Sequence, residues 1–395
     1  MRRADLSAAV QQRLVRLPPP HDSHYGVVPV APPESGLILT SIAARHRAAE
    51  DALAKVDAYA RSLHDPFVVS RILARQEAVS SSAIEGTHST LDEVLASEET
   101  QDEEARAEVR QVRKYAITVS RFIRRASLLG NDVFSTPMVR RLHRRIMQDD
   151  PDYKDPPGRL RELSVWIGGR DIAYSIFNPP PADAVPDALE DNVRYMRADG
   201  LQGVQQSLIT RMAVAHAHFE AVHPFRDGNG RVGRMLLPIL MAADGRTPLY
   251  LAPYIEANKP AYVEALKAAQ QRLDWPAMIG FVSDAVVGSA NELFTTRGAL
   301  ETLSERWMAR RAFRRNSSSV RALALLPQYP VITIARLAQL LRVTYPAAAT
   351  AVAQLEEVGV LTERTGYSRN RVFAAPEALS ILNRPFGADP ILPET

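Results

Sequence analysis

A glycine- and arginine-rich loop, HPFRDGNGRVGR at residues 223–234, separates two apolar segments of the chain. Before the loop, residues 208–222 carry apolar side chains at helical spacing, and residues 231–243 are again apolar. This periodicity predicts two helices, the second of which begins near the last glycine of the loop. The chain is therefore constrained to a helix–loop–helix unit whose polar residues gather at a helix N-terminus.

The residue types in this loop are those of a phosphate-binding site. A helix N-terminus offers unpaired N–H groups and the positive end of the helix dipole, which together attract anions. Gly228 and Gly230 let the backbone approach an anion closely, and Asn229 tolerates a left-handed turn. Arg231 and Arg234 are three residues apart, so both can reach phosphate oxygens from one side of the helix.

Two further residues of the loop indicate chemistry as well as binding. Asp227 lies beside the anion site, which suggests a bridging divalent cation, and Mg²⁺ is the usual one. His223 titrates near neutrality and can accept a proton from an attacking hydroxyl. The loop is therefore interpreted as a site for a magnesium–nucleotide. The alternative is a plain helix connection with capping glycines and surface arginines, which this clustering disfavours.

The loop resembles the signature of the Fic-domain (Fic/Doc) family, His-x-Phe-x-acid-Gly-Asn-Gly-Arg-x-x-Arg, at every position. The resemblance implies a mainly α fold, with a helical core and a β-hairpin flap, that transfers AMP from ATP to a Ser, Thr or Tyr hydroxyl of a protein target. It implies that His223 is the general base, that Phe225 anchors the loop and that Asp227 holds Mg²⁺. It also assigns phosphate binding to Gly228, Asn229, Gly230, Arg231 and Arg234.

The segment LSVWIGGRDIAYSIF at residues 163–177 has two β-rich pieces around a Gly-Gly pair, which predicts a hairpin. It resembles the flap of the family, which would pair with the target backbone by strand addition. The resemblance implies that the nucleotide-facing part comprises Trp166, Ile167, Gly168 and Gly169.

A further segment, NKPAYVEAL at residues 258–266, resembles the part of the family that lines the adenine pocket. Tyr262 matches the family pattern there and is expected to contact the nucleotide. Val263 stands where a second tyrosine is common, so the adenine contacts depart from the pattern.

The segment SSAIEG at residues 81–86 resembles the inhibitory motif Ser/Thr-x-x-x-Glu-Gly/Asn of the family. The resemblance implies that Glu85 pairs with Arg234 and occupies the space of the ATP γ-phosphate, while Ser81 supports the helix end. A helix C-terminus with an ordinary surface glutamate is the alternative. We favour inhibition because a complete core signature follows downstream.

Composition and the positions of the proline clusters divide the chain into four expected parts. Proline clusters suggest an extended arm over residues 1–36, and a long helical stretch is expected over 37–84. The acidic segment 98–110 is expected to be a solvated loop that leads into the next helix. The expected parts are an arm at 1–36, a helical region with the inhibitory motif at 37–105, a Fic core at 106–300 and a winged-helix domain at 316–384.

The winged-helix expectation rests on helices over 320–326, 334–341 and 345–358 followed by two short strands. Arg364, Arg369 and Arg371 in the wing suit phosphates, yet the third helix carries no basic residue. DNA binding and a protein-interaction or dimerisation role therefore both stay open. The second hypothesis for the whole chain is a DNA-binding regulator whose Fic core senses nucleotides. A third keeps the enzyme and changes the group that is transferred, although the DGNGR sequence is unaltered.

The composition of the 395 residues excludes several classes of protein. The chain has no cysteine, so disulfides and thiolate metal sites are absent, which fits a cytoplasmic location. No apolar run approaches a membrane span, the N-terminus lacks a secretory h-region, and a net charge of +3 does not indicate a global nucleic-acid surface. Self-modification and a homodimer stay open. No chemistry is assigned to His143, His216 or His218.

Overall fold

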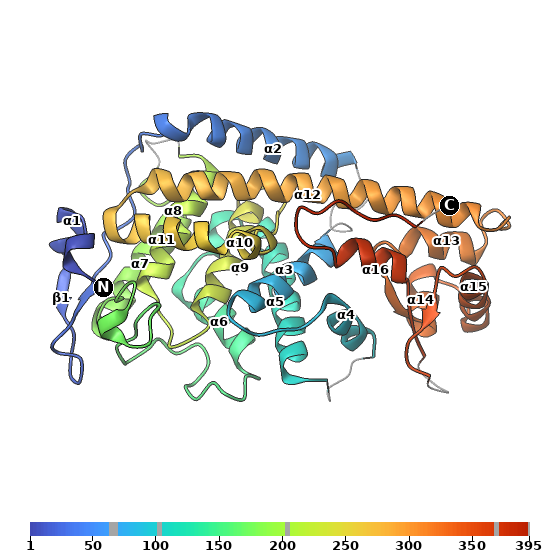
Figure 1. Ribbon diagram of the computed structural model, residues 1–395, viewed down its shortest axis with the longest axis horizontal. Helices are drawn as coiled ribbons and strands as arrows, with labels where there is room; N and C mark the ends of the chain where they lie inside the picture. Colours follow the sequence, from blue (N-terminus) through green and yellow to red (C-terminus); the bar gives the residue numbers. More distant parts are fainter. Residues whose placement is uncertain (63–69, 101–104, 202–205, 367–370, 394–395) are drawn as a thin grey trace.

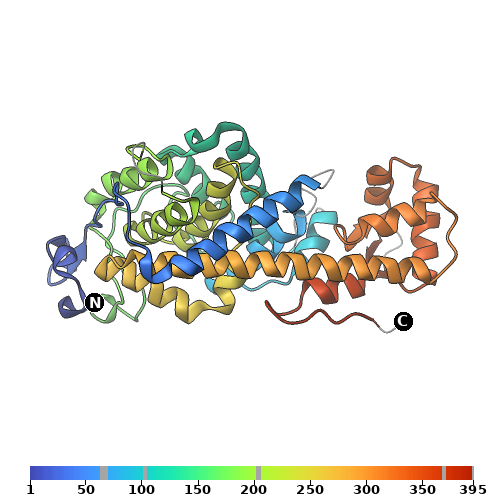
Figure 2. The same ribbon diagram turned by 90° about the horizontal axis from the view of Figure 1, so that it is seen from above.

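The computed structural model describes residues 1–62, 70–100, 105–201, 206–366 and 371–393. These residues form a mainly helical structure that is organised along one helix, α12 (Trp275–Ala309), which runs through most of its length (Figure 1). Helix α2 (Ala43–Ser62) packs on α12, runs next to it in Figure 1 and crosses it at an angle in the view of Figure 2. Among the described residues, none of the helices combines the length and the apolar character that crossing a bilayer requires.

The centre of the larger hydrophobic core is the predicted helix–loop–helix unit. Helix α8 (Leu208–Val222) has the predicted bounds, and every one of its residues is buried, including its polar and charged ones. Helix α9 (Asn229–Ala243) packs against it. The elements around this pair are α3 (Ser70–Ile84), α4 (Leu91–Thr100), α5 (Ala107–Leu129), α6 (Thr136–Met147), α7 (Val185–Met196), α10 (Ala252–Ala257) and α11 (Lys259–Arg272).

A second hydrophobic cluster lies at the far end of α12, where Leu303 and Trp307 are completely buried. Its β-strands form one antiparallel sheet in the order β3-β5-β4, with Val331 opposite Ala374. The helix order matches the expectation from sequence, whereas the identification as a winged helix stays a prediction. The elements are α13 (Ser318–Leu325), β3 (Val331–Thr333), α14 (Ile334–Leu341), α15 (Tyr345–Glu357), β4 (Thr362–Glu363), β5 (Val372–Ala374) and α16 (Pro376–Leu382).

The expectation of an extended arm over residues 1–36 is wrong, because the segment folds onto the core. It contains α1 (Ala8–Gln11), whose first turn is capped by the Ser7 hydroxyl, and the antiparallel pair β1 (Leu14–Arg16) and β2 (Tyr25–Val27). Val10 and other apolar side chains of this segment bury themselves against Phe177. Burial of these side chains outweighs the tendency of the proline clusters to keep the chain extended.

Two expectations on the N-terminal half also need correction. The stretch expected to be helical from residue 37 starts with three irregular residues and a 3₁₀ turn, and its first α-helix, α2, begins only at Ala43. Helix α3 begins at Ser70, and residues 63–69 lie outside the described part. The acidic segment 98–110 does not begin as a loop, since its first residues complete α4. Thr90 and Glu93 form a capping box that starts this helix. Short 3₁₀ turns occupy Arg3–Asp5, Thr40–Ile42, Gly130–Val133, Ile172–Tyr174 and Ala182–Ala184.

Candidate active site

The loop between α8 and α9 is closed by its own side chains. His223 ends α8 in the left-handed conformation, with φ of 48° and ψ of 62°. The side-chain amide of Asn229 accepts a hydrogen bond from Phe225 N at 2.9 Å and donates one to Phe225 O at 2.8 Å. Phe225 is completely buried, so the loop is anchored at both its centre and its end. The imidazole of His223 therefore projects from a fixed backbone.

His143, to which the sequence analysis assigned no chemistry, supports this loop from α6. Its ring stacks on Phe225 with centroids 3.8 Å apart. Gly158 N donates to His143 Nδ1 at 2.8 Å, so Nε2 carries the proton and donates to Asp227 O at 3.0 Å. Burial lowers the pKa of His143 to about 4, against a smaller opposing effect of the bond to Asp227, and the ring stays neutral. His143 is thus a positioning residue for the loop.

The N-terminus of α9 brings the expected phosphate-binding residues together. Gly228 caps the helix with φ of 77°, a conformation that favours glycine, and its N–H donates to Asp227 Oδ1 at 2.6 Å. Arg231 is buried, and its Nη2 lies 3.7 Å from Asp227 Oδ2 and 3.9 Å from Asp150 Oδ2. A carboxylate and a guanidinium therefore meet at the first turn of the helix.

The donor set at Asp227 fits a magnesium ion that arrives with a nucleotide. The described residues contain no group of three acidic or imidazole side chains that could enclose a metal ion. The side chain of Asp227 is 64% exposed, and among the described residues its Oδ2 forms an ion pair only with Arg231, at the long distance given above. Mg²⁺ binds through one or two carboxylates, phosphates and several waters, so a single exposed carboxylate beside a phosphate site suffices.

The imidazole of His223 is neutral and has an unused nitrogen. Burial lowers its pKa to about 4, and the nearby charge of Arg161 acts in the same direction. Nδ1 finds no hydrogen-bond partner among the described residues, and Glu220 Oε2 lies 4.0 Å away. Burial also raises the pKa of Glu220 to about 7. His223 can thus accept a proton at neutral pH.

Arg161 is a second functional residue that the sequence analysis missed. This buried guanidinium donates to His223 O at 2.8 Å, Pro180 O at 2.7 Å and Val222 O at 3.3 Å, and Arg161 N donates to Pro224 O at 3.0 Å. Burial lowers its pKa to about 10, so the side chain remains charged at neutral pH. Arg161 ties the base of the flap segment to the backbone that carries the imidazole.

The flap segment differs from the hairpin predicted at the two glycines. One antiparallel bridge joins Ile167 and Phe177, with Ile167 N donating to Phe177 O at 2.9 Å. The chain turns back over the intervening residues, where the Asp171 side chain caps a 3₁₀ turn by accepting from Ala173 N. The chain therefore reverses direction around this 3₁₀ turn, and not at the glycine pair, where the sequence predicted a short turn. Gly168 and Gly169 have positive φ, and Trp166 is 37% exposed.

Glu85 reaches Arg234, the last arginine of the loop, from the C-terminal end of α3. Its Oε1 accepts a hydrogen bond from Arg234 Nη2 at 2.6 Å. Arg234 Nε donates to Ser81 Oγ at 2.8 Å, and Nη2 also donates to Ser81 O at 2.9 Å. A Cβ added at Gly230 would lie 2.1 Å from Glu85 Oε1, so glycine there permits this approach. Partial burial opposes ionisation of Glu85, but the charge of Arg234 outweighs it and lowers the pKa.

Tyr262 lies in the core close to Arg234. Its side chain is 5% exposed, its ring packs against Phe281, and its hydroxyl lies 2.7 Å from His216 Nε2. The contact of Tyr262 with the nucleotide stays a prediction. His216 and His218 are both buried, as packing histidines are.

Two segments of the chain match models of known families. Residues 43–120 match the Fic/DOC family N-terminal model, and residues 133–241 match the Fic/DOC family model. A probable protein adenylyltransferase of Aquifex aeolicus is 26% identical over 199 residues, 50% of this chain and 56% of the relative. Protein adenylyltransferase fic-1 of Caenorhabditis elegans is 32% identical over 123 residues, 31% of this chain and 22% of the relative. The chain thus spans about half or less of the length of these curated relatives.

Solved structures share the arrangement of helices. A Fic family protein from Desulfovibrio desulfuricans superposes with a TM-score of 0.52 at 19% identity, over 86% of this chain and 97% of its own. Fic-1 of C. elegans superposes with a TM-score of 0.50 at 23% identity, over 66% of this chain and 74% of its own. At these identities the likeness establishes the fold, which is the mainly helical one expected from the loop signature.

Proposed function

Since the chain belongs to the Fic/DOC family, we propose that it is a protein adenylyltransferase that transfers AMP from ATP to a Ser, Thr or Tyr hydroxyl of a protein. The names of its relatives support this class of reaction. The observation that carries the proposal is the neutral imidazole of His223, held within the same loop as Asp227, Arg231 and Arg234.

In the proposed reaction, His223 accepts the proton of the target hydroxyl as its oxygen attacks the α-phosphorus of ATP. The bond from that phosphorus to the bridging oxygen of the β-phosphate breaks, and pyrophosphate leaves. The first turn of α9, from Gly228 to Gly230, supplies N–H groups for the phosphates, and Arg231 adds its charge. Mg²⁺, held by Asp227, would neutralise phosphate charge when it is bound with the nucleotide.

We propose further that the protein inhibits itself through Glu85. Arg234 is assigned to the γ-phosphate, and Glu85 already occupies the guanidinium at hydrogen-bond distance. A second negative group cannot replace the carboxylate without breaking this ion pair, so ATP binds weakly or in an unproductive position. Ser81 holds the other side of the same guanidinium and fixes the inhibited arrangement.

The transferred group distinguishes adenylylation from the other donor chemistry. The Glu85→Gly protein is incubated with Mg²⁺ and either [α-³²P]ATP or [γ-³²P]ATP, together with a mixture of candidate protein targets. We expect labelled protein with [α-³²P]ATP and none with [γ-³²P]ATP. We expect no labelled protein with either nucleotide when the Glu85→Gly protein also carries His223→Ala. Label from the γ-position would indicate phosphate transfer and would overturn the proposal.

The alternative, a DNA-binding regulator with a nucleotide-sensing core, has less support. We propose that residues 316–384 form a winged helix, but the wing arginines within the described part are engaged by carboxylates. Arg364 Nη1 lies 2.9 Å from Asp92 Oδ2, and Arg371 pairs with Glu363. Arg369 lies outside the described residues. These ion pairs leave less positive charge for a phosphate backbone.

The remaining assignments follow from the enzyme proposal. We propose that residues 37–105 carry the inhibitory helix and residues 106–300 the catalytic core. The partner is a protein with an accessible hydroxyl, which includes a second copy of this chain, and a homodimer would bring such copies together. The absence of cysteine is in keeping with action in the reducing cytoplasm.

A further inference from the structure

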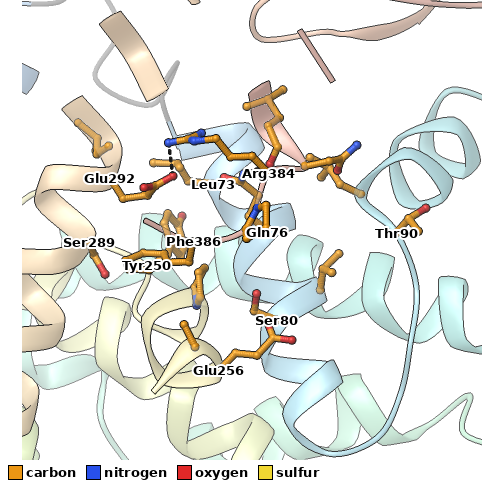
Figure 3. A pocket seen from close by; sticks show the side chains of 18 of the residues that line it. Leu73, Gln76, Ser80, Thr90, Tyr250, Glu256, Ser289, Glu292, Arg384 and Phe386 are labelled. Carbon is orange, nitrogen blue, oxygen red and sulfur yellow. Dashed lines mark hydrogen bonds and ion pairs between the residues drawn. The ribbon is translucent and has the colours of Figure 1, made fainter. Parts of the chain in front are cut away.

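A cavity of about 670 Å³ lies on the far side of the inhibitory helix from the anion loop. Figure 3 shows it from close by: α3 forms one wall, and α10, α12 and the segment after α16 form the others. Its volume lies in the range of small-molecule sites. The reaction proposed above uses none of its lining residues.

The middle of the cavity is apolar and contains an unsatisfied hydroxyl. Tyr250 and Phe386 supply aromatic surface between its two ends (Figure 3), and Leu293 adds an aliphatic side chain to the lining. Ser289 lines the same space, is only 6% exposed, and its Oγ finds no hydrogen-bond partner among the described residues. A buried hydroxyl without a partner is costly, so this position favours a ligand that carries a polar atom.

The charged side chains that line the cavity determine whether a positive or a negative ligand is favoured. Three carboxylates face the cavity, from Asp92, Glu256 and Glu292, against one guanidinium, from Arg384. Arg384 is already committed, since it pairs with Glu292 and donates to two backbone carbonyls. Asp92 is paired as well, through Oδ2 with Arg364 Nη1 at 2.9 Å, and its Oδ1 is buried without a partner in the described part of the chain. Among the described lining residues, the carboxylate that no ion pair engages is Glu256, so the remaining electrostatic preference is for a cation.

Glu256 is the carboxylate placed to receive that cation. It projects from α10 at the lower end of the cavity, next to Ser80 of α3 (Figure 3). No ion pair engages Glu256 among the residues that the structure describes. An ammonium group at this end could donate to both the Glu256 carboxylate and the Ser80 hydroxyl, while an apolar body fills the middle.

We propose that this cavity binds a small amine with an apolar or aromatic body. Its occupation stabilises the position of α3 in which Glu85 pairs with Arg234. Ser80 precedes Ser81, whose hydroxyl and carbonyl hold Arg234, so the cavity and the inhibitory contact share one turn of helix. Lys259, just after α10, donates to Ile84 O at the end of α3. An amine that bridges Glu256 and Ser80 therefore strengthens an existing connection. This regulatory part rests on the proposed function.

Binding is tested by isothermal titration calorimetry on the full chain with three matched probes: 4-phenylbutylamine, 4-phenylbutan-1-ol and 4-phenylbutyrate. We expect saturable binding of the amine, and at least about tenfold weaker binding of the alcohol and the acid. Glu256→Gln should weaken amine binding to the level of the alcohol, and Ala257→Trp should block the mouth. Glu264→Gln, an exposed carboxylate outside the lining, is the charge-matched control.

Absence of saturable amine binding would overturn the site, as would binding that Glu256→Gln and Ala257→Trp both leave unchanged. Tighter binding of the acid than of the amine would overturn the assigned charge. Circular dichroism of each variant verifies folding, and Glu256→Gln alone keeps the test decisive when Ala257→Trp does not fold.

The connection to Glu85 is tested by the affinity for ATP and Mg²⁺ with and without saturating 4-phenylbutylamine. Coupling between two sites is reciprocal, so the amine should weaken ATP binding to the wild type and leave Glu85→Gly unaffected. An equal effect on both proteins, or none on either, would overturn the coupling. A failure of ATP to bind any variant would instead reject the proposed function, because the amine titration does not depend on it.

Discussion

Glu85 Oε1 lies 2.6 Å from Arg234 Nη2, and the guanidinium is held on its other side by the hydroxyl and carbonyl oxygens of Ser81. The two partners are separated by 149 positions in the chain and meet at the first turns of α9. Arg234 is almost completely buried, whereas the Glu85 side chain is 35% exposed. The carboxylate is therefore the more accessible member of the pair, and under the proposed function it is the member that a nucleotide has to displace.

Replacement of Glu85 should free Arg234 for the nucleotide. In Glu85→Gly we expect the affinity for ATP with Mg²⁺ to rise at least about tenfold, because no ion pair then has to be broken. Glu85→Gln keeps the shape of the side chain and removes its charge. The affinity of this variant for ATP should therefore lie between those of the wild type and Glu85→Gly. Isothermal titration calorimetry measures all three. Equal affinities of the wild type and Glu85→Gly would show that the contact does not restrain the site.

Arg161 should matter for stability and for catalysis at once. Arg161→Lys cannot reach His223 O, Pro180 O and Val222 O together, which leaves buried carbonyls unsatisfied. We expect a loss of about 2–4 kcal/mol in the free energy of unfolding. In the Glu85→Gly background the rate of transfer should fall more than the affinity for ATP. The exposed Arg159→Lys is the matched control, and a similar effect of both changes on the transfer rate would argue against a positioning role.

His143 offers a test of how the loop is held. His143→Phe retains a ring to stack on Phe225 but removes the partners of Gly158 N and Asp227 O. The expected cost is about 1–3 kcal/mol in urea unfolding, with slower transfer in the Glu85→Gly background. His143→Phe with wild-type stability and rate would mean that stacking alone positions the loop.

Glu77 should make stability depend on pH. It is buried on α3, where it accepts from Tyr115 OH and Ala252 N. Burial raises its pKa from 4.5 to about 7, against smaller opposing effects of these hydrogen bonds. The folded state therefore binds a proton that the unfolded state releases, and this contribution to stability is lost as the pH rises through 7.

The matching variant is Glu77→Gln, which removes the titration and keeps the shape. Relative to this variant, the free energy of unfolding of the wild type should fall by about 3 kcal/mol between pH values below 4.5 and above 7. Urea unfolding across that range measures the difference, with the exposed Glu264→Gln as control. If the free energies of unfolding of the wild type and Glu77→Gln differ by the same amount at every pH, the assigned protonation of Glu77 is contradicted.

Local patterns allowed the helices around the loop to be predicted well. The expected bounds of α8 and α14 agree with the structure, because each helix begins at a capping residue and ends where the apolar pattern stops. Helix α12 extends to Ala309, into the part of the chain that follows the expected Fic core of residues 106–300. It continues because Ala299, Leu303 and Trp307 recur every four residues and pack into the second cluster, a signal that the sequence does contain.

Other features depend on contacts between distant segments and have no local signature. Arg161 and His143 bind backbone carbonyl and amide groups that only the folded chain brings to them, so no motif marks either residue. The packing of Tyr262 against Phe281 also joins residues that are distant in the chain, and the nucleotide contact implied for Tyr262 stays a prediction. In contrast, the pairing of Glu85 with Arg234 was implied by the resemblance, and the structure brings the two together.

Intact-mass spectrometry after incubation with ATP and Mg²⁺ tests the central claim most directly. It compares the wild type, Glu85→Gly, and Glu85→Gly combined with His223→Ala. We predict a mass gain of one AMP in Glu85→Gly, little or none in the wild type, and none in the double variant. This result would identify the reaction, its base and its inhibitor together. An equal gain in the wild type and Glu85→Gly, or a gain that survives His223→Ala, would contradict the account.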